Sequence, residues 1–248
     1  MATALYSKGY VHSLHDYSLF YKKSPSSIIF VVVHVDDVII TGTSSTEITE
    51  LKTFLHDQFK IKDLGRLHYF LSLEVLYKED GVIISQRKFA LDLLKEFDCL
   101  HYTNLASPLD PNVKLKAKEG VDPREPHLQA ALHLLRYLKG DPTLGIFMSN
   151  NPDCTIKGYC DSDWAACPDC RRSVSGYLVL QGTSPISWKS TKKETISLSS
   201  AEAEYRSLRK VVGELTWLCR LFEELTVPFS TPTFLSRSFW SFTMGAQA

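Results

Sequence analysis

The chain has 248 residues, of which 44% are hydrophobic, and its formal net charge is zero. This length allows one large domain or two small ones with buried cores, and the charge argues neither for nor against a nucleic-acid partner. No uninterrupted apolar run reaches the roughly 18 residues of a membrane span. The N-terminus also lacks the apolar core of a secretory signal, so we expect an intracellular protein of the cytoplasm or nucleus, with no membrane partner.

Hydrophobic periodicity in the N-terminal half predicts short strands mixed with amphipathic helices. Ser44-Ser-Thr-Glu47 has the spacing of a capping box and predicts a helix start. The predicted elements, in chain order, are the end of a helix at 5–14, strands at Ser18–Tyr21 and Ile28–His34, a helix at about 46–58, a hairpin of Leu67–Tyr77 and Val82–Gln86, and a helix at Arg87–Phe97.

The second half begins with a proline-rich and charged stretch at 103–126, which predicts a linker. A helix follows at His127–Leu138 and is ended by Gly140-Asp-Pro142. From residue 144 the pattern changes to three short strands and one long helix with a sustained helical period. These elements are expected at about 154–161, 174–181, 185–189 and 198–225.

Two adjacent carboxylates, Asp36 and Asp37, interrupt the strand pattern of Phe30–Gly42, which reads FVVVHVDDVIITG. Burying one unpaired carboxylate costs several kcal/mol, so a tight hairpin with both side chains at its tip is favoured over a continuous buried strand. Such a tip could hold a divalent metal of the kind used in phosphoryl transfer. The alternative is an ordinary Asp-Asp turn between two strands.

A second pair of carboxylates is expected where the first strand of the C-terminal half faces the long helix. At about 100° per residue, Glu204 lies within the apolar stripe of the helix, whereas Glu202 faces almost the opposite way. The alternative is that Glu204 favours the helix dipole and reaches solvent. Asp161 ends the first predicted strand, where it could face the first turn of that helix. For Asp163 we favour a turn or cap residue.

The remaining chemically active residues favour structural interpretations. Cys167-Pro-Asp-Cys170 has the spacing of half a zinc site, but no second pair lies at a suitable distance, and free thiols are expected. Trp164 and Trp188 are expected in the core rather than stacked on bases. Lys189, Lys192 and Lys193 form a local basic cluster that could touch a phosphate, although a solvated loop is favoured.

Several long blocks resemble the Pol polyprotein of copia-type LTR retrotransposons, in the same order. HVDD resembles the YxDD hairpin of reverse transcriptases, with His34 in place of Tyr. The blocks GYVHSLHDYSLFYKK, FKIKDLGRLHYFLSLEV and ISQRKFALDLLKEF are similar to the polymerase region. The blocks REPHLQAALHLLRYLKG, GYCDSDWAACPD, RRSVSGYLVLQG, ISWKSTKKETISLSSAEAEY and ELTWL are similar to the linker and ribonuclease H region.

The resemblance implies an α/β (α+β) fold, with a reverse-transcriptase palm and thumb remnant followed by an incomplete ribonuclease H-like βββα unit. The implied regions are a partial reverse transcriptase at 1–102, a linker and connection helix at 103–143, a partial ribonuclease H-like domain at 144–228, and a divergent tail at 229–248. It also implies Mg²⁺ as cofactor and an RNA/DNA hybrid as partner. The implied catalytic and metal-holding residues are Asp36, Asp37, Asp161 and Glu204.

The chain also departs from the family pattern. The polymerase family supplies another essential Asp from a strand well upstream of the hairpin, and the Asp residue before the hairpin, Asp16, matches a different block. A helical stretch after Glu119 looks deleted. After Pro228 the resemblance collapses, and Gly245 stands where a third ribonuclease H acid should be. We therefore expect a remnant that is inactive as this fragment. The alternative is a noncatalytic domesticated module that binds nucleic acid or protein.

Overall fold

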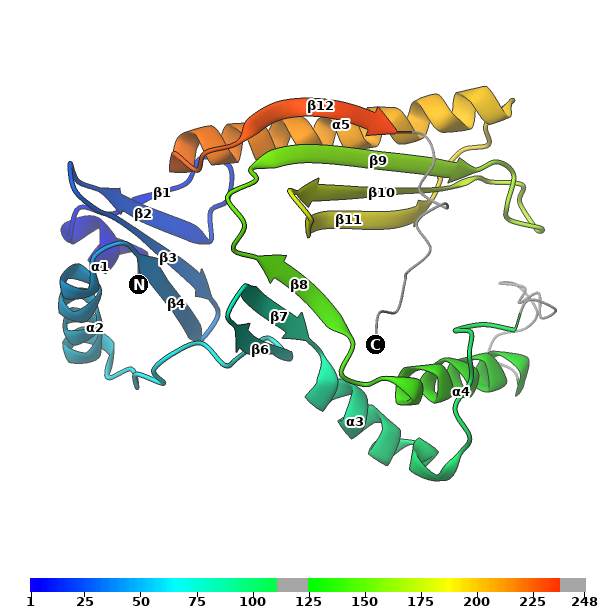
Figure 1. The fold of residues 1–248 in the computed structure, drawn as a ribbon, viewed down its shortest axis with the longest axis horizontal. Coiled ribbons are helices and arrows are strands. Elements are labelled where there is room, and N and C mark those ends of the chain that lie inside the picture. The colour runs from blue at the N-terminus through cyan, green and yellow to red at the C-terminus, as the bar shows by residue number, and fades with distance from the viewer. Residues whose placement is uncertain (111–124, 237–248) are drawn as a thin grey trace. The chain divides into compact units, whose positions relative to one another are not determined.

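The structure, a computed structural model, describes residues 1–110 and 125–236 (Figure 1). It divides into two compact units. Unit 1 comprises Met1–Leu67 and Glu214–Phe229, and unit 2 comprises His68–Gly213 and the chain from Ser230 onward. These units are defined by packing, so the domain boundaries implied by the family resemblance remain a prediction. Most of the expected linker, the region after Glu119 and the position of Gly245 lie outside the described residues.

Unit 1 contains an antiparallel sheet with the strand order β1-β2-β3-β4. Its strands are β1 (Val11–His12), β2 (Leu19–Lys23), β3 (Ile28–His34) and β4 (Asp37–Gly42). The expected strand at 28–34 is confirmed. The expected helix at 5–14 is wrong beyond its first residues, because α1 covers Ala2–Ser7 and the chain then turns at Gly9, whose φ of 83° suits glycine.

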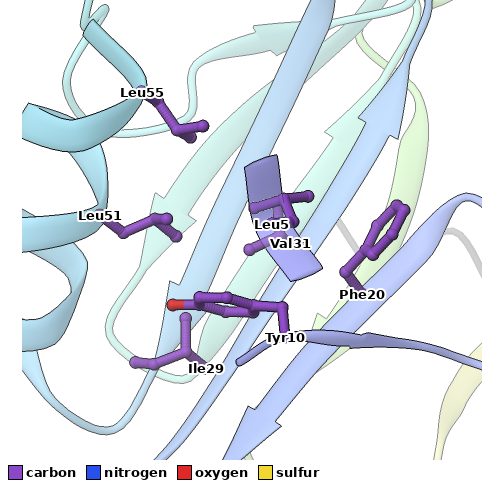
Figure 2. Packing of buried hydrophobic residues seen from close by; sticks show 7 residues of the cluster. All are labelled: Leu5, Tyr10, Phe20, Ile29, Val31, Leu51 and Leu55. Atoms are coloured by element: carbon purple, nitrogen blue, oxygen red, sulfur yellow. The ribbon is translucent and has the colours of Figure 1, made fainter. Parts of the chain in front are cut away.

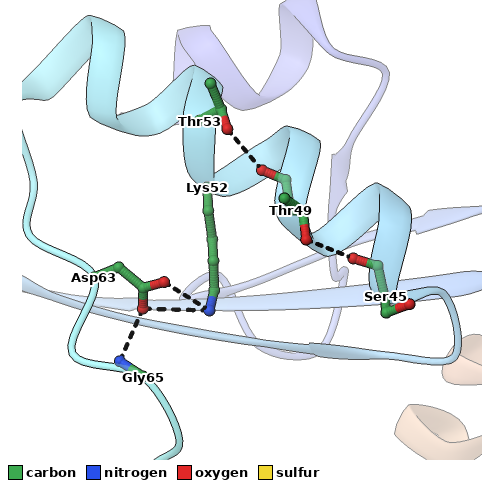
Figure 3. A network of polar contacts seen from close by, with 6 residues as sticks. All are labelled: Ser45, Thr49, Lys52, Thr53, Asp63 and Gly65. Atoms are coloured by element: carbon green, nitrogen blue, oxygen red, sulfur yellow. Dashed lines mark hydrogen bonds and ion pairs between the residues drawn. The ribbon is translucent and has the colours of Figure 1, made fainter.

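The second helix of unit 1 begins where the capping box predicted. Helix α2 covers Ser45–Phe59, and the Glu47 backbone N–H donates to Ser44 Oγ at 3.3 Å. The Glu47 carboxylate accepts a hydrogen bond from Ser27 Oγ and thereby links the helix start to the loop before β3. Figure 3 shows the exposed side of α2, where Lys52 Nζ pairs with Asp63 at 3.0 Å and the Gly65 N–H donates to the same carboxylate.

The core of unit 1 forms where α1 and α2 pack on one face of the sheet (Figure 2). Alternate residues of β3 point into it, so Ile29 and Val31 are fully buried. Leu51 and Leu55 are one turn apart on α2 and cover them, because residues four apart lie on the same face of a helix. The full cluster of buried residues is Leu5, Tyr10, Phe20, Ile29, Val31, Leu51 and Leu55.

The end of the long helix α5 (Ser200–Leu225) also belongs to unit 1. The Glu224 carboxylate accepts hydrogen bonds from Leu14 N at 2.8 Å, Ser13 Oγ at 2.7 Å and the Tyr21 hydroxyl at 3.4 Å. Burial opposes the charge on Glu224, but the donors from Leu14 and Ser13 outweigh it and lower the pKa below its ordinary value. One carboxylate therefore fixes the helix end to the β1–β2 connection and to β2.

Unit 2 contains a sheet with the order β5-β6-β7-β8, whose neighbouring strands are antiparallel. The predicted hairpin across residues 79–81 is confirmed by the turn between β6 and β7. The single strand expected at Leu67–Tyr77 is wrong, because Leu71 and Ser72 adopt positive φ and divide it into β5 and β6. The strands are β5 (Tyr69–Phe70), β6 (Leu73–Lys78), β7 (Gly81–Ser85) and β8 (Gly145–Ser149), the last of which the sequence did not predict.

The other sheet of unit 2 has the order β11-β10-β9-β12. Its first three strands correspond to those predicted at about 154–161, 174–181 and 185–189, and they form an antiparallel meander. The strand after α5 lies parallel to β9, in the part of the chain where the family resemblance has ended. The bounds are β9 (Thr155–Asp163), β10 (Val174–Gln181), β11 (Ser184–Lys192) and β12 (Ser230–Ser236).

Besides the start of α5, the described part of unit 2 contains two α-helices and a short 3₁₀ turn. They are α3 (Arg87–Glu96), the short 3₁₀ turn η1 (Cys99–His101) and α4 (Glu125–Gly140). Helices α3 and α4 confirm the two amphipathic helices predicted at Arg87–Phe97 and His127–Leu138. Among the helices of the described ranges, none is long and apolar enough to cross a membrane.

We predict that Leu55→Ala destabilises the protein by about 2–5 kcal/mol, because it leaves a cavity beneath α2 in a fully buried position. Urea unfolding followed by circular dichroism measures this free energy. Leu64→Ala is the matched control, because Leu64 is 78% exposed and its truncation should change stability by less than about 0.5 kcal/mol. Equal effects of the two substitutions would contradict the core assignment.

We also predict a pH-dependent effect of Glu224→Gln. A lowered folded-state pKa stabilises the protein above the unfolded value of about 4.3, and this contribution is lost as pH falls through the folded pKa. At pH 7 the variant should lose about 1–2 kcal/mol of unfolding free energy, since it removes a charged acceptor. The difference should shrink at acidic pH, whereas Glu223→Gln, at an exposed neighbouring position, should show little change at either pH.

Candidate metal centres

The first candidate centre is the turn between β3 and β4. His34 is the last residue of β3 and pairs with Asp37, the first residue of β4, so Val35 and Asp36 form the loop. Val35 has a φ of 51° and is 84% exposed. A β-branched residue is unusual in this left-handed region, so the turn has a local conformational cost. The prediction that Asp36 and Asp37 lie at an exposed hairpin tip is confirmed.

This tip presents two carboxylates to solvent without burying either charge. Carboxylate oxygens are the ligands that hard cations such as Mg²⁺ prefer, so the donor type fits. Within the described ranges, however, His, Cys, Asp and Glu side chains form no group of three or more suited to holding a metal ion. The role of Asp36 and Asp37 as metal ligands therefore remains a prediction.

The second candidate centre lies where the start of α5 packs on β9. The Ser207 hydroxyl is buried and lies 2.9 Å from the main-chain oxygen of Asp161 and 3.2 Å from that of Gly176. Glu204 precedes Ser207 by three residues, so the two side chains share one side of the helix. The structure thus places the backbone segments that carry Asp161 and Glu204 against each other. The approach of their two carboxylates remains a prediction.

The buried side of α5 differs in part from the predicted stripe. Ala203, Ser207 and Val211 are buried and Glu204 is half-buried beside them, whereas Tyr205 is 64% exposed. The helical period predicted an apolar stripe of Ala201, Tyr205, Leu208, Val211, Val212, Leu215, Leu218, Phe222 and Leu225. This stripe is wrong for Ala201, Tyr205 and Val212, all of which are exposed. Small side chains let the helix approach the sheet closely, so packing at this end depends on Ala and Ser rather than on large apolar residues.

Glu202 has a structural role at the start of the helix. The Glu202 backbone N–H donates to Ser199 Oγ at 3.1 Å, and its carboxylate accepts a hydrogen bond from Leu198 N at 2.7 Å. The same carboxylate pairs with Arg206 at 2.6 Å, one turn further along. These contacts form a reciprocal cap of the capping-box kind, so α5 begins at Ser200. Asp163 is exposed and ends β9 before a turn.

Two interpretations from the sequence are corrected here. Trp164 and Trp188 are 48% and 58% exposed, so neither is a core residue, and Trp164 Nε1 donates to Ser197 O at 2.9 Å.

Lys193 was expected in a solvated loop but is only 8% exposed, and its Nζ donates to Arg206 O. Burial, followed by the charges of Lys210 and Arg206, lowers the pKa of Lys193. Lys193 follows the last residue of β11, and its backbone N–H donates to Ser173 O. This hydrogen bond holds Lys193 against the sheet and so buries its side chain.

Comparison with known proteins identifies the class. The family described as "Reverse transcriptase (RNA-dependent DNA polymerase)" matches residues 1–111. The chain is 33% identical to the "Retrovirus-related Pol polyprotein from transposon RE1" of Arabidopsis thaliana, over 90% of this chain and 18% of that polyprotein. It is 27% identical to the corresponding polyprotein from transposon TNT 1-94 of Nicotiana tabacum, over 88% of this chain and 20% of that polyprotein. No solved structure matches.

The chain therefore belongs to the reverse transcriptase family of copia-type retrotransposon Pol polyproteins. It spans about a fifth of the length of these polyproteins. By contrast, it covers 94% of the "Uncharacterized mitochondrial protein AtMg00810" of Arabidopsis thaliana, to which it is 30% identical over 76% of this chain.

We predict that Ser207→Ala weakens unit 2 by about 0.5–1.5 kcal/mol, because it removes the hydroxyl that bonds to the β9 and β10 backbones. Thermal unfolding measures the change. Ser190→Ala, at an exposed position of β11, is the control and should change stability by less than about 0.5 kcal/mol. If Ser207→Ala were as mild as the control, α5 would not be held to β9 in this way.

Proposed function

We propose that this chain is a remnant of a retrotransposon RNA-directed DNA polymerase joined to a ribonuclease H. Its ancestral activities are metal-dependent nucleotidyl transfer and hydrolysis of RNA in an RNA/DNA hybrid. The observation that supports the polymerase part most directly is the β3–β4 tip with Asp36 and Asp37, which lies within the matched residues 1–111. We assign the palm and thumb remnant to 1–102 and the linker and connection helix to 103–143.

We assign the partial ribonuclease H-like region to 144–228 and the divergent tail to 229–248. The support is topological, because β9, β10 and β11 form an antiparallel meander and α5 follows it. This is the βββα order implied by the resemblance. The strand after the helix, β12, lies parallel to β9, where a further strand of such a unit could continue the sheet.

Magnesium is the proposed ancestral cofactor of both regions. Asp36 and Asp37 would hold it at the hairpin tip, and Asp161 and Glu204 would hold it between β9 and α5. When bound, the cation would stabilise the charge that develops on phosphate oxygens during transfer or hydrolysis. The carboxylates themselves would orient the cation and leave open positions for those oxygens.

We further propose that the 248-residue chain has no useful catalytic rate by itself. Two-metal chemistry requires several carboxylates around each reaction centre, and each candidate centre here offers one pair. Magnesium dehydrates reluctantly and needs near-ideal octahedral coordination, so a two-carboxylate site should bind it weakly. Misplacing the reacting groups by about 1 Å already costs on the order of a hundredfold in rate.

Primer extension on an RNA template and cleavage of an RNA/DNA hybrid test this proposal with the purified chain, in magnesium and in manganese. We expect both signals to equal those of Asp36→Asn and Glu204→Gln, the matched controls that remove one charge from each centre. If the unmodified chain were active and one of these substitutions abolished that activity, the proposed inactivity would be overturned. The result would then support the metal centre that contains the substituted residue.

The alternative is a noncatalytic module that binds nucleic acid or protein. The observation that favours nucleic acid is the edge strand β11, which exposes Trp188, Lys189 and Lys192. Exposed aromatic and basic side chains together suit single-stranded nucleic acid, on which bases stack while cations contact phosphates. Fluorescence anisotropy of a labelled oligonucleotide tests this alternative. Salt-sensitive binding that Trp188→Ala weakens would support a nucleic-acid-binding module. Absence of binding would exclude nucleic acid as the partner of this module.

A further inference from the structure

The connection between β9 and β10 contains two cysteines in a turn closed by its own backbone. Cys167 N donates to Arg172 O at 3.0 Å, and Arg171 N donates back to Cys167 O at 2.8 Å. Further hydrogen bonds hold the base of the loop, because Ala165 N donates to Ser173 Oγ and Lys193 N donates to Ser173 O. The backbone around Cys167 and Cys170 is therefore ordered before any ligand or reagent arrives.

Within this turn the two sulfur atoms are already close. Cys170 Sγ donates to Cys167 Sγ at 3.2 Å, and both residues are only half-buried, so neither lies in the core. A disulfide has an S–S distance of about 2.0 Å, so a bond requires the sulfurs to approach by little more than 1 Å. None of the six cysteines, all of which lie in the described ranges, forms a disulfide in this structure.

The charge environment distinguishes Cys167 from the other cysteines. The side chain of Lys192, at the end of β11, contacts Cys167 and, with the hydrogen bond from Cys170, lowers the pKa of the Cys167 thiol to about 6. Cys167 is then mostly thiolate at pH 7, and the thiolate is the nucleophilic form. Burial and the charge of Glu223 instead raise the pKa of Cys219.

We propose that Cys167 and Cys170 form a thiol modification site that reacts with small disulfides and closes to an intramolecular disulfide. The Cys167 thiolate attacks one sulfur of the reagent, forms a mixed disulfide and expels the other half as a thiolate. Cys170 loses its proton and attacks Cys167 Sγ, which releases the second half. The two cysteines are thereby oxidised by two electrons, and the reagent is reduced to two thiols.

The chemical class of the reagent follows from the site. The nearby Lys192 ammonium is exposed and positively charged, so it favours small anionic disulfides such as oxidised glutathione over neutral ones. Cys167 and Cys170 are not among the residues assigned to the candidate metal centres. The proposed reaction is therefore independent of whether those centres hold a metal.

Peptide mass mapping of the full chain after treatment with oxidised glutathione at pH 7 tests the proposal. We expect the peptides that contain Cys167 and Cys170 to lose two hydrogen atoms, and Cys99, Cys154, Cys160 and Cys219 to stay unmodified. Cys170→Ser should stop the reaction at the glutathione adduct of Cys167. Retention of both free thiols in the unmodified chain, or oxidation of all six cysteines at equal rates, would overturn the proposal.

Alkylation by iodoacetamide at varied pH tests the role of Lys192 without relying on disulfide formation. The rate at Cys167 should rise with a midpoint at about pH 6. Lys192→Gln should move this midpoint toward the ordinary value of about 8.5 and slow alkylation at pH 7 by about threefold or more. Lys189→Gln, which removes an exposed charge from the same strand, should leave the midpoint unchanged. A midpoint near the ordinary value in the unmodified chain would overturn the proposal.

Discussion

The strict alternation of side chains along two inner strands, β3 and β9, determines the positions of the candidate centres. In β3, Ile29 and Val31 point into the core of unit 1, and this register brings the chain to its turn at Val35 and Asp36. In β9, Ile156 and Cys160 are buried, and Asp161 takes the opposite face. A shift of one residue in either strand would exchange buried and exposed side chains, and the carboxylates would lose their placement.

Local signals were sufficient for the elements that the sequence predicted well. The Ser44–Glu47 spacing defined the start of α2, and the Asp-Asp pair located the β3–β4 turn. The turn at Leu71 and Ser72 lacks the Gly, Asn or Asp residues that normally indicate positive φ, so two short strands looked like one. Strand β8 is stabilised by pairing with β7, far away in the sequence, and such a partner has no local signature.

The candidate sites show the same division between local and long-range information. Asp161, Glu204, Asp36 and Asp37 were identified from pattern and resemblance, whereas Ser207 and Glu224 were not. Each of these two bonds to backbone or side-chain groups that only the folded chain brings near. Lys193 was misjudged for a similar reason, because its burial depends on contacts with Ser173 and Arg206. Polar residues that hold elements together carry no periodic signal of their own.

The position of β11 at the edge of its sheet affects the solubility of the chain. An edge strand leaves backbone donors and acceptors open to a strand from another molecule, and such pairing can propagate into aggregates. β11 carries Lys189 and Lys192, both exposed, in its second half. Charged side chains of this kind repel a second copy of the same edge. The basic residues of β11 should therefore oppose intermolecular β-pairing at this edge of the sheet.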